Sequence, residues 1–291
     1  MFPIIEIGSI HLSTYWVIYG LAIVVGGMLA LHRLVQGGFP VHHATQFVLL
    51  PIWGGIVGAF LGGSLAFLLR TFIITGTLTW QRGSAFMGAL IGCASVALLY
   101  CRRYGLPPGR AFDLEWLSVP LGQAIGRLGC LAAGCCCGKA TDSWLGMYLP
   151  NVHGDWMVRY PTQLMSSGAN LLIFIGLLAF DHYRTRRLDR PEGSALSSSK
   201  GVALNLSKGW PFDGFLFLLY VDLYCLKRFT VEFLRDTPPP LIGPFTLAHI
   251  ACFVGFLLST ALMLRNLRST APSSERVALS PTAAGGQDRL C

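Results

Sequence analysis

The sequence predicts an all-α polytopic membrane protein with about seven transmembrane helices. Of its 291 residues, 53% are hydrophobic and only 12% are charged, whereas roughly 25% of the residues in an ordinary soluble domain are charged. Several apolar runs reach the ~20 residues that a membrane-spanning helix needs. These runs are continuous rather than alternating, which favours helices over a β-barrel. Glu6 and the lack of a basic residue before the first long apolar run argue against a cleavable signal peptide.

The apolar runs divide one expected transmembrane domain, residues 1–268, into seven spans. Breaks between them contain charged residues, Gly or Pro, as in the Pro-Pro-Gly turn at 107–109. A flexible Ser- and Gly-rich cytoplasmic linker is expected at 191–209, and a disordered cytoplasmic tail at 269–291. The expected spans are Tyr15–Leu34, Gln46–Leu69, Ala85–Tyr100, Phe112–Ala133, Pro161–Phe180, Phe212–Leu234 and Phe245–Met263.

The basic residues are distributed unequally between the two sides of the expected bundle. The loops after the first, third and fifth spans and the C-terminal tail contain most of them, including Arg102, Arg103 and Arg110. By the positive-inside rule, the N-terminus is outside and the C-terminus is in the cytoplasm. The formal charge of +8 reflects these loops, so nucleic acid is not expected as a partner.

One face of the second span is rich in small residues. Glycines on a helix surface let the backbones of two helices approach closely, so this face predicts a tight helix–helix contact. The residues are Gly54, Gly55, Gly58, Gly62 and Gly63.

The stretch GQAIGRLGCLAAGCCCG, residues 122–138, contains an arginine at the end of the fourth expected span. An arginine near mid-membrane depth costs about 3 kcal/mol or more on insertion scales, so Arg127 is expected to face a cavity or a partner. Gly126 and Gly129 flank it and allow a ligand or another backbone to approach. The alternative is that Arg127 snorkels to the nearer interface.

Four cysteines follow this arginine closely: Cys130, Cys135, Cys136 and Cys137. A structural disulfide, for example between Cys130 and one of the other three, suits the outer face of a membrane. A thiol-redox or soft-metal site is the alternative. Adjacent cysteines surround one tetrahedral ion poorly, and no histidine lies at ligand spacing. We therefore expect a disulfide and no bound metal, and a membrane thiol-redox or metal-binding protein is the second functional hypothesis.

A second charged stretch, YCLKRFTVEFLRD, ends the sixth expected span. Arg228 and Glu232 can pair there, which is how ionisable groups persist inside a bilayer. The alternative is an interfacial salt bridge that anchors the helix end, above all for Arg235. Because the fourth and sixth spans end on the same side, Arg127 and Arg228 can face one cavity and bind an anionic phosphate ester. Spacings of four, four and three put these residues on one helical stripe: Tyr224, Arg228, Glu232 and Arg235.

Four stretches, in this order, resemble those of the prolipoprotein diacylglyceryl transferase family over about residues 5–265. The resemblance implies transfer of a diacylglyceryl group from phosphatidylglycerol to the lipobox cysteine thiol of a preprolipoprotein, with release of glycerol phosphate. It places this reaction at the outer leaflet of the bacterial cytoplasmic (inner) membrane and requires no cofactor or metal. The stretches are GALIG at 88–92, GRLG at 126–129 with Gly138 beyond it, PTQL at 161–164 and RFTVEFLR at 228–235.

The resemblance also implies which residues act. Arg127, Arg228 and Glu232 fall on catalytic positions. The partners are phosphatidylglycerol and the signal peptides of preprolipoproteins. The family's first-helix tyrosine falls on Tyr15 or Tyr19, and the remaining substrate-binding positions are Gly88, Gly126, Gly129, Gly138, Tyr224 and Arg235.

Three positions depart from the family pattern. Met87 stands where the family has a histidine, Cys130 where it has an asparagine, and Cys135 where it has a glutamate. The missing imidazole removes the usual candidate for a general base toward the substrate thiol. Either the base is dispensable, another group serves, or the chain has altered chemistry. A non-catalytic lipid-binding paralogue is therefore a further alternative.

The chemistry of the transfer is consistent with the charged residues. An attacking sulfur must be a thiolate, and the departing phosphate monoester gains negative charge that fixed cations stabilise. Arg127 and Arg228 supply such cations. Glu232 orients an arginine by pairing with it or accepts a proton.

Overall fold

The structure is a computed structural model that describes residues 4–7, 10–78, 86–150, 154–188, 211–236 and 243–270. Four short strands form two antiparallel hairpins, and the rest of the regular structure is helical. The strands are β1 (Ile4–Ile7), β2 (Ile10–Ser13), β3 (Met147–Pro150) and β4 (Trp156–Arg159). The helices are α1 (Thr14–Gln36), α2 (Val41–Thr75), α3 (Phe86–Tyr104), α4 (Pro108–Trp116), α5 (Val119–Ala132), α6 (Thr162–Leu188), α7 (Phe215–Glu232) and α8 (Leu247–Thr270).

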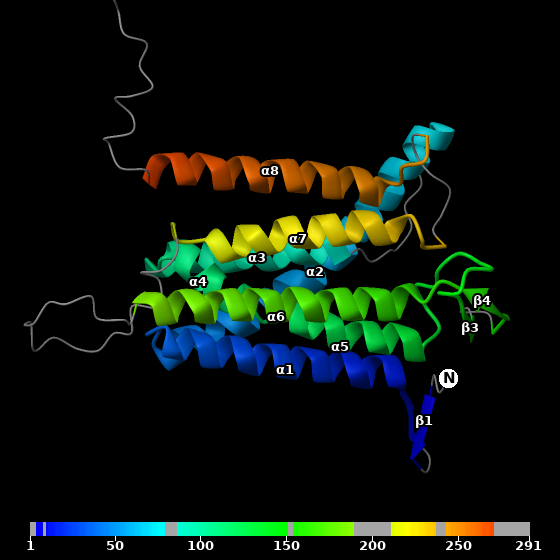
Figure 1. Cartoon of the computed structure of the whole chain (residues 1–291), viewed down its shortest axis with the longest axis horizontal. Helices are drawn as coiled ribbons and strands as arrows, with labels where there is room; N and C mark the ends of the chain where they lie inside the picture. Colours follow the sequence, from blue (N-terminus) through cyan, green and yellow to red (C-terminus); the bar gives the residue numbers. More distant parts are fainter. Residues whose placement is uncertain are drawn as a thin grey trace, which may run out of the picture.

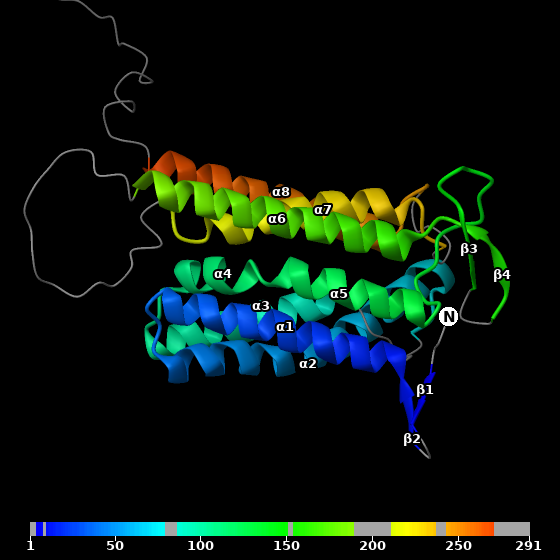
Figure 2. The same cartoon turned by 60° about the horizontal axis from the view of Figure 1, so that its bottom comes forward.

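Most of the helices lie side by side along the long axis of the molecule (Figure 1). The β1–β2 and β3–β4 hairpins lie at the same end of the bundle, together with the C-terminal ends of α5 and α7 (Figure 2). We call this the hairpin end. The chain runs away from it in α1, α6 and α8, and returns toward it in α5 and α7 (Figure 1, Figure 2).

Four helices are long and apolar enough to cross a membrane by length and composition: α1, α2, α6 and α8. They correspond to the first, second, fifth and seventh expected spans. In contrast, α5 has only 14 residues, and α7 contains Asp222, Lys227, Arg228 and Glu232. Large apolar side chains such as Trp53, Met28 and Leu258 are exposed on the helices, as expected where lipid rather than water surrounds them. The prediction of a helical polytopic membrane protein is confirmed, with the two hairpins as an addition.

The fourth expected span is two helices rather than one. α4 ends at Trp116 and α5 begins at Val119, with Pro120 in its first turn. A proline inside a helix lacks the N–H donor and clashes with the carbonyl four residues earlier, whereas it is tolerated in the first turn. That carbonyl belongs to Trp116, where α4 ends. The break therefore follows from Pro120, and the prediction of one continuous span over 112–133 was wrong.

Asp113 lies in α4 but stabilises the start of a different helix, α7. A carboxylate is favourable at a helix N-terminus, whichever part of the chain supplies it. In the structure the Asp113 carboxylate accepts hydrogen bonds from the backbone N–H groups of Gly214, at 2.7 Å, and Phe217, at 2.9 Å. These N–H groups lie at the start of α7, where the helix itself provides no hydrogen-bond acceptor for them. Asp113 therefore caps α7 from a distant part of the chain.

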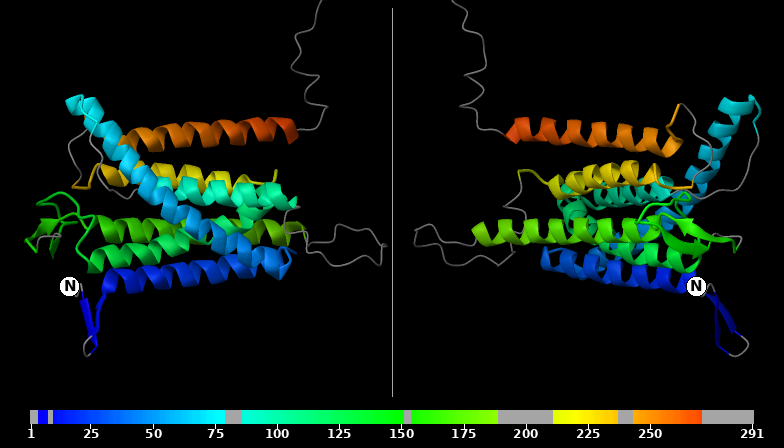
Figure 3. Two further views of the ribbon diagram at one scale, coloured as in Figure 1. Left: turned by 180° about the vertical axis from the view of Figure 1, so that it is seen from behind. Right: turned by 45° about the vertical axis from the view of Figure 1, so that its right-hand side comes forward.

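The glycine-rich face of α2 packs against α3, as the sequence predicts. A Cβ atom on Gly58 would collide with the carbonyl oxygen of Gly88, and one on Gly92 with that of Gly54. Gly88, which the family resemblance assigns to substrate binding, thus lies in this helix contact. α2 runs obliquely across the bundle (Figure 3), and its 35 residues extend beyond both ends of the expected span.

The aromatic core lies away from the hairpin end. It joins the end of α1, the start of α2, the end of α3, α4 and the start of α7 through residues such as Leu34, Phe47, Tyr100, Phe112 and Tyr220. An ion pair between Arg33 and Asp181, at 2.6 Å, connects α1 to α6 at the end of the bundle opposite the hairpin end.

Several predictions concern parts that the structure does not describe. The linker at 191–209 and nearly all of the tail at 269–291 lie outside the described residues. Met87 belongs to α3, but its side chain is also outside the described part.

Gly58→Ala should lower the free energy of unfolding by about 1–3 kcal/mol, because the added methyl group overpacks the α2–α3 contact. Gly168→Ala in α6 is the matched control: its Cβ meets nothing within 4 Å, so it should be neutral or slightly stabilising. Thermal unfolding of the detergent-solubilised protein measures both. Equal stability of the two variants would contradict the close contact.

Candidate functional site

The charged residues singled out in the sequence come together at the hairpin end of the bundle. Arg127 lies near the end of α5, and Arg228 and Glu232 lie in the last turns of α7. The Gln123 side chain of α5 donates to the Tyr220 hydroxyl of α7 at 2.7 Å, which ties the two helices together. The expectation that the fourth and sixth spans converge is therefore met by α5 and α7.

Glu232, the last residue of α7, pairs with Arg228 of the same helix and with Arg235 just after it. Its Oε2 lies 2.6 Å from Nη1 of Arg228 and 3.5 Å from Nη1 of Arg235. Its Oε1 accepts a hydrogen bond from the Thr246 hydroxyl at 3.4 Å. The Glu232 side chain is 4% exposed, whereas both arginines are 16% exposed. The carboxylate is thus buried and fully paired, while the arginines retain donors that can face a ligand.

Positive charge exceeds negative charge around this carboxylate. The Arg127 guanidinium is close enough to interact with Tyr224 and with Lys227, and Lys227 in turn with Arg228. Lys227 Nζ lies 4.5 Å from the centre of the Tyr224 ring and donates to Asn170 Oδ1 at 2.8 Å. We call the four cations Arg127, Lys227, Arg228 and Arg235 the cation cluster. Among the ion pairs of the described residues, Glu232 is the carboxylate that pairs with it.

The glycines beside Arg127 serve helix packing. A Cβ on Gly126 would lie 3.7 Å from the Tyr19 ring, and one on Gly129 would lie 3.4 Å from the Tyr15 carbonyl oxygen. These glycines face α1. Of the two expected alternatives, a ligand or another backbone close to the glycines, the structure shows the second, with α1 as the neighbouring helix. Because Arg127 lies one residue after Gly126, it projects from a different side of α5.

Both candidate tyrosines of the first span lie next to the site. The Tyr15 and Tyr19 rings stack with their centres 5.8 Å apart. Tyr15 is the nearer to the cysteine loop, because it interacts electrostatically with Cys130, Cys135 and Cys136. Tyr224, the third tyrosine of the prediction, is 2% exposed.

The loop of residues 134–138 is held by hydrogen bonds from α6. Thr162 Oγ1 donates to the Cys136 carbonyl at 2.8 Å, and Gln163 Nε2 donates to the Cys135 carbonyl at 2.9 Å. Both side chains are 1% exposed. The PTQL stretch of the sequence thus fixes this loop, a role that the sequence alone did not reveal.

The same loop is joined to the end of α7 by its backbone. The Asp236 N–H donates to the Cys137 carbonyl at 3.0 Å, and the Lys139 N–H donates to the Leu234 carbonyl at 2.9 Å. A Cβ on Gly138 would collide with the carbonyl oxygen of Tyr160 and lie 2.7 Å from the Tyr160 Cβ. Gly138 is therefore required by close packing.

All four cysteines of this region, Cys130, Cys135, Cys136 and Cys137, are free thiols in the structure, so the disulfide expected between two of them is not formed there. The Sγ atoms of Cys130, Cys135 and Cys136 lie within 4.8 Å of one another. Cys136 adopts a positive φ of 60°, which is unusual for a residue other than glycine. Hydrogen bonds from the Cys130 and Cys135 thiols lower the pKa of Cys136, and the positive charges of Arg235 and Arg127 lower it further.

Sequence reasoning missed Lys227, Asn170 and His249. Lys227 follows Tyr224 by three residues and precedes Arg228, so it lies beside the helical stripe that begins at Tyr224. This spacing could have identified it as a candidate site residue. Asn170 is a polar residue in an apolar run, which is a weaker signal. The position of His249 beside Glu232 depends on the packing of α8 against α7, and no local pattern encodes that contact.

His249 is placed as a structural residue. It is 2% exposed and lies against the Phe233 ring, with the ring centres 4.3 Å apart. Its Nδ1 accepts the Thr246 backbone N–H at 3.1 Å, so the neutral imidazole carries its proton on Nε2. Nε2 is buried and lacks a hydrogen-bond partner among the described residues. His249 therefore supports Thr246 and Glu232, and its acceptor nitrogen is already used.

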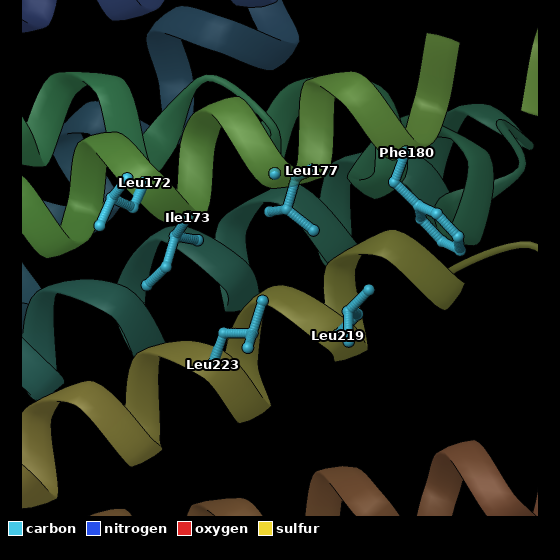
Figure 4. A pocket seen from close by; sticks show the side chains of 7 residues that line it. Leu172, Ile173, Leu177, Phe180, Leu219 and Leu223 are labelled. Atoms are coloured by element: carbon cyan, nitrogen blue, oxygen red, sulfur yellow. The ribbon is translucent and has the colours of Figure 1, made fainter. Parts of the chain in front are cut away.

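An apolar groove leads away from the cation cluster between α6 and α7. Its volume is about 390 Å³, and its side chains project toward one another from the two helices (Figure 4). Ile173 lies three residues after Asn170, and Leu223 lies four residues before Lys227. The hydrogen bond between Lys227 and Asn170 thus lies about one helical turn beyond the groove. The groove is lined by Leu172, Ile173, Gly176, Leu177, Phe180, Leu219 and Leu223.

Comparison with known proteins places the chain in one family. Residues 3–265 match the family described as prolipoprotein diacylglyceryl transferase. A phosphatidylglycerol–prolipoprotein diacylglyceryl transferase of Clostridium tetani is 30% identical over 80% of this chain and 84% of its own. The enzyme of that name from a Wolbachia of Drosophila simulans is 31% identical over 80% and 81% of the two chains.

A transferase of the same name, numbered 2, from Clostridium perfringens is 26% identical over 90% of this chain and 93% of its own. The family match over residues 3–265 includes α5 and α7, which carry Arg127, Lys227 and Arg228. The chain belongs to the prolipoprotein diacylglyceryl transferase family, a family of membrane transferases, as the four sequence motifs predicted.

Proposed function

We propose that this protein transfers the diacylglyceryl group of phosphatidylglycerol to the lipobox cysteine thiol of prolipoproteins, and that the cation cluster binds the phosphate. The observation that carries this proposal is the grouping of Arg127 and Lys227 with Arg228, which itself pairs with the buried Glu232 carboxylate at the end of α7. An excess of positively charged side chains that are only partly exposed is suited to binding a phosphodiester. Membership in the family supplies the reaction.

The charge of the cluster matches the charge that the reaction develops. The thiolate sulfur attacks the terminal glycerol carbon of the diacylglyceryl group, so that a C–S bond forms and the C–O bond to phosphate breaks. The singly charged phosphodiester leaves as glycerol phosphate, a monoester with more negative charge, and the thiol proton passes to solvent. Fixed guanidinium groups stabilise this developing charge more than they stabilise the ground state.

The apolar groove is suited to an acyl chain. It begins about one turn from Lys227 and is lined by side chains of α6 and α7 alone (Figure 4). A lipid whose phosphate contacts Lys227 and Arg228 can extend a chain along Leu223 and Leu219. Burial of each CH₂ group there contributes about 0.8 kcal/mol relative to water, although a lipid already in a bilayer gains much less.

The orientation of the site follows from loop charge. The hairpin end contains the N-terminal strand and the cation cluster. The opposite end contains Arg102 and Arg103 in the last turn of α3 and Arg110 in the first turn of α4. The positive-inside rule favours a cytoplasmic location for this α3–α4 connection. The hairpin end then faces outward from the bacterial inner membrane, toward the signal peptides of exported prolipoproteins, and the expected count of seven spans is part of this proposal.

Reporter fusions should place the loop at 102–110 in the cytoplasm and the loop at 138–159 outside, because the basic residues gather in the first. A phosphatase reporter active only outside and a fluorescent reporter active only in the cytoplasm distinguish the two sides. A cytoplasmic signal from the 138–159 loop would reverse the proposed orientation.

Arg127→Lys should lower transfer about 10- to 100-fold, the equivalent of losing a charge-assisted hydrogen bond. A point ammonium keeps the charge but cannot bind two phosphate oxygens as a planar guanidinium does. The assay is transfer of labelled diacylglyceryl from phosphatidylglycerol to a lipobox peptide by purified protein. Arg33→Lys, which alters an ion pair at the far end of the bundle, is the matched control and should stay near wild type.

An active wild type with an equally active Arg127→Lys variant would refute the two-oxygen contact. If the wild type binds phosphatidylglycerol but transfers nothing, a lipid-binding paralogue becomes the better interpretation, with Met87 in place of the family histidine as its cause.

Arg235→Ala should reduce transfer less than Arg228→Ala, because Arg235 lies 3.5 Å from Glu232 and Arg228 only 2.6 Å.

Glu232→Gln should reduce kcat at least about tenfold and leave KM for phosphatidylglycerol unchanged or lower. The amide can still hydrogen-bond but cannot neutralise Arg228 and Arg235, so the phosphate binds while the arginines lose their fixed orientation. Asp181→Asn, the equivalent change in the ion pair with Arg33, is the control. A raised KM with an unchanged kcat would show that Glu232 acts in ground-state binding alone.

A further inference from the structure

We infer that Cys130, Cys135 and Cys136 form a binding site for one soft, thiophilic metal ion of the Cu(I) class, a site that diacylglyceryl transfer does not require. Their three Sγ atoms lie within 4.8 Å of one another. A trigonal ion with metal–sulfur bonds of about 2.3 Å holds its sulfurs about 4 Å apart. Small side-chain rotations thus suffice to close the site.

The backbone of the loop is shaped to bring these sulfurs together. Adjacent cysteines in an extended chain point to opposite sides, which is why the sequence argued against a metal. Cys136 instead adopts a positive φ of 60°, and its Sγ lies within 4.8 Å of the Sγ atoms of Cys135 and of Cys130, which is in the last turn of α5. A strained conformation at a non-glycine residue persists only where its surroundings hold it. Here Thr162 and Gln163 hold the carbonyls of Cys136 and Cys135.

The geometry favours three-coordinate chemistry. Among the described residues, the cluster contains three thiols and no histidine or carboxylate. The fourth cysteine of the region, Cys137, is directed elsewhere: its Sγ donates to the Gly134 carbonyl at 2.9 Å. Zinc in structural sites is almost always tetrahedral with four ligands, whereas thiolate sites with fewer ligands select soft ions such as Cu(I).

Two arginines lie near such a complex. Three thiolates and one monovalent cation carry two negative charges in excess, and binding releases three protons to solvent. Arg127 and Arg235 both interact with Cys136, although Arg235 is shared with the Glu232 carboxylate. Compensation of this kind is what permits a charged group in a partly buried position.

The site occupies positions where the family pattern has other groups. By the resemblance, Cys130 and Cys135 stand where the family pattern has an asparagine and a glutamate. The test therefore measures metal binding directly and does not depend on transfer activity.

The purified full-length protein in detergent, reduced and kept under anaerobic conditions, is titrated with Cu(I) against the chromogenic chelator bicinchoninate. We expect one equivalent of Cu(I) per chain, and X-ray absorption should count three sulfur ligands. Single Cys130→Ser, Cys135→Ser and Cys136→Ser variants should each weaken binding at least about tenfold. Cys137→Ser is the matched control from the same loop and should bind as wild type does.

Thermal unfolding of each variant shows that a loss of binding is not a loss of fold. Failure of the wild type to withdraw Cu(I) from bicinchoninate would overturn the inference. So would undiminished binding by Cys136→Ser, or a loss of binding in Cys137→Ser, since the latter requires a different ligand set. A wild-type protein purified with a disulfide between two of the three cysteines that reductant does not open would also exclude the site.

Discussion

The Glu232 carboxylate is the constraint around which the functional end of the molecule is organised. It is buried and shared by Arg228, Arg235 and the Thr246 hydroxyl. A buried carboxylate without partners would cost several kcal/mol, so the two arginines and the start of α8 are fixed by their need to satisfy it. The remaining positive charge, on Arg127 and Lys227, is left for a ligand.

Both ends of α7 are positioned by parts of the chain that are distant in sequence. At its N-terminus the Asp113 carboxylate of α4 accepts two backbone N–H donors. At its C-terminus the chain hydrogen-bonds to the cysteine loop through Lys139 and Asp236. α4 and α5 together thus hold α7 at both ends. The cation cluster is preorganised because α7, which carries Lys227 and Arg228, cannot slide or rotate freely.

Two of the three positions that depart from the family pattern implied by the resemblance lie together. Cys130 and Cys135 stand at two of the altered positions, and with Cys136 they form a thiol cluster beside Arg127. The resemblance implies an amide and a carboxylate at these two positions, and this chain has thiols there. In the proposed metal site, thiolates at these positions would neutralise the neighbouring guanidinium as a carboxylate does, and would also bind a thiophilic ion.

The sequence by itself determined the membrane class, the four apolar helices α1, α2, α6 and α8, the glycine contact of α2 and the pairing of Arg228 with Glu232. All of these depend on local composition or on helical spacing, which the order of residues encodes directly. The division of one expected span at Pro120 was also encoded locally, but continuous hydropathy concealed it.

Only the tertiary structure decided which distant groups meet. Asp113 caps a helix that begins about a hundred residues later, Gln163 fixes a cysteine loop, and His249 supports Thr246. Local rules could not find these contacts, because a hydrogen-bonding side chain encodes the need for a partner but not its identity. That identity is set when the helices pack, since packing fixes which of many chemically suitable groups comes within about 3 Å.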